Sequence, residues 1–210
     1  MARPYLAVVG NIGSGKTSLA NIIASTLDWC LIAEPIQENP YFVGDTYRAL
    51  EDIAFRLQVY YLGFRAQQHL KALECAGPAI QDRTIYEDSE VFSETYFERG
   101  AYSLPDIENL RRLYAVLARV LPVPDLFIYT YAPINVLQQH ILGRNRSFEK
   151  SLDEALLIHL QRNYERWIQR QSVAPVLKID TSKINYVDDD AAKQYVINII
   201  IERINELNLW

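Results

Sequence analysis

The sequence has little cysteine and no long apolar run. Its 210 residues include two cysteines, Cys30 and Cys75, which are too few for a disulfide framework and wrongly spaced for a zinc site. We therefore expect two reduced thiols in a cytoplasmic protein. No apolar stretch approaches the ~18 residues that a membrane-spanning helix needs. A strand-like run that begins at Tyr5 leaves no room for a signal peptide, so we expect none.

The chain also lacks an excess of basic residues. Lysine and arginine total 21, aspartate and glutamate total 26, and the formal net charge is −5. A net negative chain without a dense basic block is a poor nonspecific binder of nucleic acid. We therefore expect neither nucleic acid nor a membrane among its partners. Half of the residues are apolar and 22% are charged, a balance typical of a globular protein.

Short apolar runs alternate with longer segments of helical period. The predicted strands are 5–9, 29–33, 79–81, 125–129 and 175–179, each apolar on both faces like the buried strands of a parallel sheet. The predicted helices are 17–27, 45–74, 151–171 and 189–206. Strands separated by helices predict a three-layer α/β sandwich, with a five-stranded parallel sheet in a single domain over 1–210. Ligands of such sheets bind beyond the carboxyl ends of the strands.

A phosphate-binding pattern follows the first predicted strand. The segment G-N-I-G-S-G-K-T matches G-x-x-x-x-G-K-[ST] without a gap and leads into a predicted helix. The nucleotide-binding residues it predicts are Gly10, Asn11, Ile12, Gly13, Ser14, Gly15, Lys16 and Thr17. Lys16 is expected at the β- and γ-phosphates, and Thr17 at Mg²⁺. The flanking strand and helix disfavour a chance glycine-rich turn, and the lack of an N-K-x-D motif disfavours a GTPase.

Charged residues follow the second and third predicted strands. Glu34 lies where it can take a proton from an attacking hydroxyl; taken alone, it also reads as a surface or capping acid. Asp82 suits the Mg²⁺ shell, and Arg83 is placed to keep Glu34 ionised, unless the two form a merely structural ion pair. Their position beside a phosphate loop favours catalysis.

A pair of arginines, Arg144 and Arg146, follows the fourth predicted strand and a helix. Phosphoryl transfer concentrates negative charge on the transferring group, and arginines commonly neutralise it. The alternative is a solvated basic turn. The two arginines therefore predict a lid over the phosphates.

These motifs together resemble the deoxynucleoside kinase family over about residues 5–186, and the bacterial deoxyadenosine/deoxyguanosine kinases most of all. The resemblance implies a P-loop kinase fold with a lid at about 143–150. It also implies 5′-phosphorylation of deoxynucleosides by ATP with Mg²⁺, in nucleotide salvage, and a homodimer. The chain departs from the family at His140, where many members carry an arginine.

The resemblance also assigns roles to single residues. It makes Gln58 and Arg65 the base-reading pair, and their spacing of two helical turns places both on one helix face. The substrate-binding residues it implies are Glu34, Tyr47, Gln58, Arg65, Arg83, Asp88, Phe92 and Glu149. Of these, Tyr47 and Glu149 would hold the sugar 3′-hydroxyl, and Phe92 would stack on the base. Residues 180–186 would cup the adenine of ATP.

Two alternatives remain open at this point. A thymidylate-type monophosphate kinase shares the phosphate loop and a D-R motif, but its charged acceptor needs extra cations where this chain has Glu34. A kinase-fold subunit without catalysis would be expected to have lost Lys16, Glu34 or Arg83. The base preference is expected to be deoxyadenosine or deoxyguanosine, with deoxycytidine as a further candidate, and thymidine is disfavoured by the carboxylate of Asp88.

Overall fold

The fold is built on a parallel sheet. The computed structural model describes residues 3–34, 39–41, 50–149 and 151–210. The strands are β1 (Tyr5–Gly10), β2 (Cys30–Ile32), β3 (Ala79–Asp82), β4 (Leu126–Tyr131) and β5 (Val176–Asp180). They pair in the order β2-β3-β1-β4-β5, all parallel. The predicted five-stranded parallel sheet is therefore confirmed.

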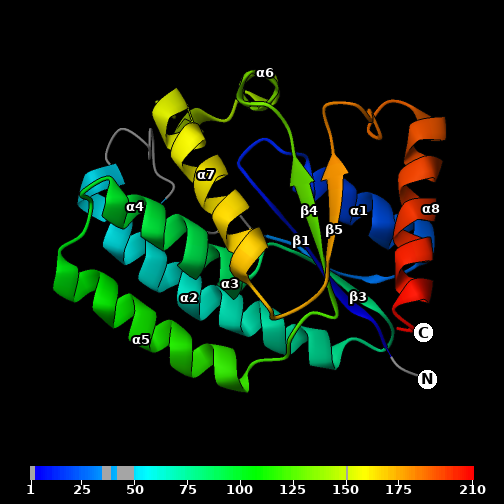
Figure 1. Ribbon diagram of the computed structural model, residues 1–210, viewed down its shortest axis with the longest axis horizontal. Helices are drawn as coiled ribbons and strands as arrows, with labels where there is room; N and C mark the ends of the chain where they lie inside the picture. The colour runs from blue at the N-terminus through cyan, green and yellow to red at the C-terminus, as the bar shows by residue number, and fades with distance from the viewer. Residues whose placement is uncertain (1–2, 35–38, 42–49, 150) are drawn as a thin grey trace.

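Helices cover both faces of this sheet (Figure 1). The α-helices are α1 (Lys16–Leu27), α2 (Leu50–Glu74), α3 (Ile85–Glu87), α4 (Glu94–Glu98), α5 (Leu104–Val120), α6 (Ile134–Arg144), α7 (Glu154–Arg170) and α8 (Asp190–Glu206). A π-helix, η3 (Asp88–Ser93), and a 3₁₀ turn, η4 (Ser147–Glu149), complete the set. Within the described ranges, no helix combines the length and apolar character needed to cross a membrane.

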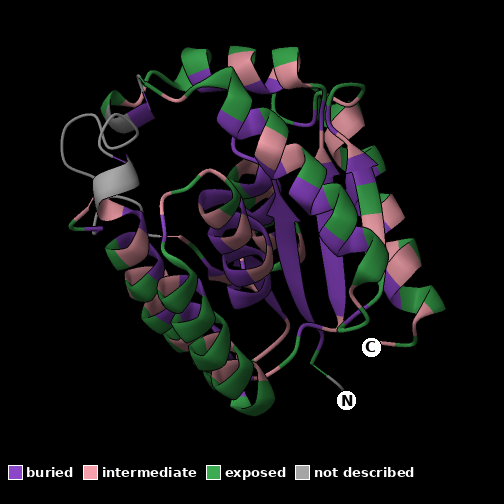
Figure 2. Ribbon diagram, turned by 60° about the vertical axis from the view of Figure 1, so that its left-hand side comes forward, coloured by how far each residue is buried: buried purple, intermediate pink, exposed green. Residues whose placement is uncertain are grey.

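Two apolar cores sandwich the sheet, because side chains alternate between its faces along each strand. Along β1, Leu6 and Val8 pack against α1 and α8, whereas Ala7 and Val9 pack against α2, α5 and α7. All four side chains are fully buried. Strand β1 is buried along its whole length and β4 is buried except at Tyr131 (Figure 2). Residues at the carboxyl ends of these strands are consequently held on a rigid platform.

The turn after β3 starts a short run of helices that carries functional side chains. Thr84 caps α3: its side-chain oxygen accepts from the Glu87 backbone N–H, and the Glu87 carboxylate accepts from the Thr84 N–H in return. The chain then widens into η3, which carries Asp88 and Phe92. Single π turns inside helices occur frequently at functional sites.

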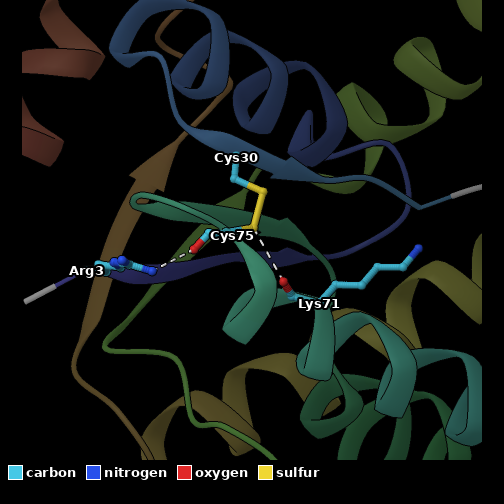
Figure 3. Close-up of a disulfide and its surroundings, with 4 residues drawn as sticks. All are labelled: Arg3, Cys30, Lys71 and Cys75. Atoms are coloured by element: carbon cyan, nitrogen blue, oxygen red, sulfur yellow. Dashed lines mark hydrogen bonds between the residues drawn. A yellow bond between two sulfur atoms is a disulfide. The ribbon is translucent and has the colours of Figure 1, made fainter.

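The prediction of reduced thiols is wrong. Cys30 and Cys75 form a disulfide with their Cα atoms 6.0 Å apart (Figure 3). The two cysteines are separated by 45 residues, but β2 pairs with β3 so that Cys30 lies opposite Ala79. Cys75 comes four residues before Ala79, and therefore the crossover through α2 brings it back to the edge strand. Arg3 donates to the Cys75 carbonyl at 3.1 Å on the same edge.

Candidate active site

The phosphate loop joins β1 to α1 as the sequence predicts. Gly15 has φ of +87°, and a Cβ there would lie 2.2 Å from the hydroxyl oxygen of Tyr186, so the position requires glycine. Lys16 is buried and donates from Nζ to the Asn11 carbonyl at 2.7 Å. Burial, followed by repulsion from Arg83, lowers the pKa of Lys16 to about 7. Phosphates in the loop would restore its charge.

Buried side chains tie the loop to α7. The side chain of Asn11 donates to the Leu157 carbonyl at 3.0 Å, so it fastens the loop to that helix. Glu87, a residue that sequence reasoning missed, accepts from the Gly10 N–H at 3.2 Å and from the Tyr164 hydroxyl. Burial raises the pKa of Glu87 to about 7. In the sequence, the only signal for Glu87 was its place three residues after Thr84, which is the spacing of a helix capping box.

Thr17 and Asp82 meet at the mouth of the loop, as predicted for a Mg²⁺ site. The Thr17 hydroxyl donates to Oδ2 of Asp82 at 2.6 Å. The other oxygen, Oδ1, is buried and has no hydrogen-bond partner among the described residues. Burial, followed by repulsion from Glu34, raises the pKa of Asp82. A hydroxyl beside an unsatisfied carboxylate oxygen is a donor set that fits Mg²⁺.

Four charged side chains form a buried cluster at the ends of β2 and β3. Arg65 is fully buried and contacts Oε1 of Glu34 and Oδ2 of Asp88, each at 2.5 Å. Arg83 lies 3.2 Å from the other oxygen of Glu34 and 3.9 Å from Asp88. Burial alone would raise the pKa of Glu34, but Arg65 and Arg83 outweigh it and hold that pKa below its ordinary value. Glu34 is therefore a carboxylate, ready to accept a proton.

A first cavity opens over this cluster. Its lining comprises Ile12, Gly13, Lys16, Thr17, Glu34, Leu57, Gln58, Tyr61, Arg83, Asp88, Phe92, Tyr96, Arg144, Arg146 and Glu149. The structure thus brings together nearly all of the predicted substrate-binding residues around one cavity. Arg65 does not line the cavity but contacts two residues that do, and Tyr47 falls outside the described residues. The guanidinium of Arg83 lies 4.7 Å from the centre of the Phe92 ring.

Sequence reasoning missed three lining residues, Leu57, Tyr61 and Tyr96. Leu57 and Tyr61 lie beside Gln58 on α2, and Tyr96 follows Phe92 by one turn. Helical spacing from the predicted residues was the available signal, but each also reads as an ordinary core residue.

In this structure the predicted lid residues Arg144, Arg146 and Glu149 pair with one another. Arg144 ends α6, and its guanidinium contacts both carboxylate oxygens of Glu149, at 2.6 and 2.8 Å. Arg146 lies 3.9 Å from the same carboxylate. The three predicted lid residues therefore form one charged group over the phosphate loop.

A second cavity, of about 640 Å³, also borders the loop, and its volume is within the size range of small-molecule sites. Its lining includes His140, whose Nδ1–H donates to the Gly13 carbonyl at 2.8 Å, and the segment from Thr181 to Asp188. The two cavities share Gly13, Lys16, Thr17, Arg144 and Arg146. Cavities that meet at a phosphate loop and its arginines, with a carboxylate in one of them, define a P-loop phosphotransferase.

Comparison with known proteins specifies the family. The model of the family described as Deoxynucleoside kinase matches residues 6–205. The chain belongs to the deoxynucleoside kinase family and is an enzyme of that family, which confirms the resemblance seen in the sequence.

Similar proteins carry related names. The chain is 27% identical over 203 residues to a deoxyadenosine/deoxycytidine kinase of Bacillus subtilis, covering 96% of this chain and 93% of that one. It is 32% identical over 193 residues to a deoxyadenosine kinase of Dictyostelium discoideum, covering 91% and 77%. The solved structure of the M. mycoides deoxyadenosine kinase with bound dCTP superposes with a TM-score of 0.80 at 27% identity, covering 96% of this chain and 99% of that one.

Proposed function

We propose that this enzyme transfers the γ-phosphoryl group of ATP to the 5′-hydroxyl of a deoxynucleoside, as a step of nucleotide salvage. The observation that carries this proposal is the place of Glu34: an ionised carboxylate in the first cavity, next to the phosphate loop, held by Arg65 at 2.5 Å and Arg83 at 3.2 Å. Glu34 accepts the proton of the 5′-hydroxyl as that oxygen attacks the γ-phosphorus. The bond from the γ-phosphorus to the bridging oxygen breaks, and ADP leaves from the second cavity.

The residues that line both cavities bind the phosphates and neutralise their charge. Lys16 leaves the Asn11 carbonyl and binds the β- and γ-phosphates. Arg144 and Arg146 neutralise the transferring group, which requires Arg144 to release Glu149. The freed Glu149 then accepts a hydrogen bond from the 3′-hydroxyl of the sugar. Thr17 and Asp82 would hold Mg²⁺, which supplies charge neutralisation at the phosphates when bound.

The first cavity, in which the deoxynucleoside would bind, favours bases with an exocyclic amino group. Asp88 lines this cavity and is fixed by Arg65, and it accepts a hydrogen bond from such a group. Thymine presents a carbonyl there, which leaves Oδ1 of Asp88, the oxygen that Arg65 does not contact, without a donor at a cost of ~1–3 kcal/mol or more. This contact argues against thymidine and does not rank the other three deoxynucleosides. On the resemblance of the sequence to the bacterial kinases, we propose deoxyadenosine and deoxyguanosine, and after them deoxycytidine, as substrates. The names of the similar proteins support this choice, and the family match disfavours the thymidylate-type monophosphate kinase.

Glu34→Gln tests this function. It keeps the shape of the side chain but removes the proton acceptor, so kcat should fall by ~10²–10⁴-fold while ATP affinity stays within about twofold. The assay measures ADP release with each of four deoxynucleosides, after thermal unfolding has verified that the variant folds. Glu98→Gln, an exposed carboxylate on α4, is the matched control and should leave kcat unchanged. Turnover of Glu34→Gln within about threefold of wild type rejects the role of Glu34. A wild-type protein that phosphorylates none of the four deoxynucleosides, and so behaves as the non-catalytic subunit, rejects the function.

We also propose a homodimer that forms through α2 and α5. These helices pack side by side (Figure 1) and carry exposed apolar side chains. They are Val59, Leu70 and Leu73 on α2, and Leu113, Val116 and Val120 on α5. A second copy of the chain would cover this apolar face.

Light scattering coupled to size exclusion tests the dimer. Wild type should elute with twice the mass of the chain, and Val116→Glu should elute as a monomer. A monomeric wild-type protein rejects the dimer. We propose a cytoplasmic location, where ATP is available, and cell fractionation tests it.

A further inference from the structure

Arg83 has an unusual backbone. Its φ is +68°, in the left-handed region that residues other than glycine, asparagine and aspartate rarely adopt. The strain lies in the D-R-T turn, from which the guanidinium reaches Glu34 at 3.2 Å. Strained conformations persist only where the surroundings hold them, and they are concentrated at functional sites. The groups that hold this turn are therefore part of the site.

A buried glutamine holds the turn. Gln81 precedes Asp82 on β3, is completely buried, and donates from Nε2 to the Arg83 carbonyl at 2.7 Å. The Arg83 N–H donates in turn to the Val8 carbonyl of β1 at 3.0 Å. Both backbone polar groups of Arg83 are thus paired while its φ is positive. A polar side chain fully buried in a sheet needs such partners to offset its burial.

The amide of Gln81 has its direction fixed from behind. Its Oε1 accepts the hydroxyl hydrogen of Tyr5 at 2.5 Å. The other contact of that hydroxyl oxygen is Nδ1 of His69, at 3.1 Å. Nε2 of His69 accepts from the Ile85 N–H at 3.2 Å, so its hydrogen is on Nδ1, which also lies 2.9 Å from the Pro122 carbonyl. Since Tyr5 supplies a donor to Oε1, the NH₂ group of Gln81 must face Arg83.

We propose that Gln81 is a positioning residue that holds the backbone of Arg83 in its strained form and so keeps the guanidinium on Glu34. The proposal rests on the proposed phosphoryl transfer, in which Arg83 and Glu34 act on the reacting groups. Without the amide, the Arg83 carbonyl loses its partner and the turn relaxes toward negative φ. The guanidinium then leaves the carboxylate, and Glu34 and the transferring phosphoryl group lose a fixed positive charge.

Gln81→Met tests the role, because methionine keeps the length and packing of the side chain but donates no hydrogen bond. We expect kcat to fall about tenfold, with KM for ATP and for deoxyadenosine within about twofold of wild type. Asn163→Leu is the matched control: it also removes a buried amide that donates, to Thr95 at 2.9 Å on α4. It should lower the melting temperature to a similar extent and leave kcat within about twofold.

A double-mutant cycle separates positioning from simple stability. If Gln81 acts through Arg83, then Gln81→Met lowers kcat about tenfold in wild type and has almost no effect in an Arg83→Ala background. An equal loss in both backgrounds, or a wild-type kcat in the single variant, overturns the proposal. Should Gln81→Met fail to fold, Tyr5→Phe removes the bond that directs the amide, and kcat must then fall about two- to threefold only when Arg83 is present. Wild type that phosphorylates no deoxynucleoside would instead overturn the proposed function.

Discussion

The buried contacts of Arg65 lead to a prediction that joins stability to specificity. Its guanidinium makes three short contacts, to Asp88 and Glu34 at 2.5 Å and to Gln68 at 2.6 Å, and its side chain has no exposed surface. Arg65→Met leaves Asp88 and Glu34 buried with a single cation near both, Arg83 at 3.9 and 3.2 Å. Asp88→Ala leaves Arg65 with Glu34 and Gln68, so the second change is the milder one.

The magnitudes follow from the burial. Removing one partner of a buried ion pair costs about 3–5 kcal/mol, and each kcal/mol lowers the melting temperature of a chain of this size by about 2–4 °C. Arg65→Met should therefore melt ~6–20 °C below wild type. The double variant Arg65→Met, Asp88→Ala removes one charge of each sign and leaves Glu34 with Arg83. Its loss of stability should be smaller than the sum of the single losses by about 1–3 kcal/mol.

Substrate preference is the second quantity measured in this experiment. The double variant lacks the carboxylate that excludes thymine, so its ratio of kcat/KM for thymidine to that for deoxyadenosine should rise about tenfold or more. The control is Arg111→Met with Glu94→Ala, an equally close pair at 2.6 and 2.8 Å but a half-exposed one; its coupling should be about 0–1 kcal/mol. Additive losses at Arg65 and Asp88, or an unchanged substrate ratio, would refute this reasoning.

Three further predictions concern the phosphates and the disulfide. Lys16→Ala should weaken ATP binding and lower kcat, whereas Arg144→Ala should lower kcat with little change in the Kd for ATP; an effect of Arg144→Ala on KM alone contradicts its lid role. Because the pKa of Lys16 is lowered to about 7 by burial without ligand, and phosphate raises it again, nucleotide binding at pH 8 should take up protons. Calorimetry in two buffers with different ionisation enthalpies measures this uptake, which Lys16→Met should lose; equal heats for wild type contradict it. Reduction of the disulfide, whose cysteines are 45 residues apart, should lower the free energy of unfolding by about 2–5 kcal/mol. Dithiothreitol should therefore lower the melting temperature of wild type and leave that of a Cys30→Ser, Cys75→Ser variant unchanged.

The sequence alone determined the features that depend on neighbouring residues. The phosphate loop could be read because glycine spacing, strand and helix all lie within about twenty residues of Lys16. The face shared by Gln58 and Arg65 follows from the helical period, and the carboxyl-end positions of Glu34 and Asp82 follow from parallel strands. Each of these inferences needs local geometry and one rule of topology.

Tertiary structure decided which of these residues pair with one another. Arg65 bridges Glu34, 31 residues before it, and Asp88, 23 residues after it, because the strand order places β2 beside β3 with α2 packed across their ends. The same crossover returns Cys75 to Cys30, which spacing along the chain could not indicate. Helix α5 was absent from the sequence prediction, although Ser103 and Asp106 form its capping box.

The strained turn at Arg83 shows most clearly what the sequence determines and what the tertiary structure decides. The D-R-T motif can be read in the sequence, but φ of +68° at an arginine depends on a buried amide, a tyrosine and a histidine from three separate elements. Likewise, Arg144 and Glu149 were predicted for different parts of the substrate, and only the folded lid brings them into contact. A local sequence pattern indicates which element a residue belongs to and what chemistry its side chain offers. Which residues it contacts is decided by burial and long-range pairing, because these depend on segments far apart in the chain.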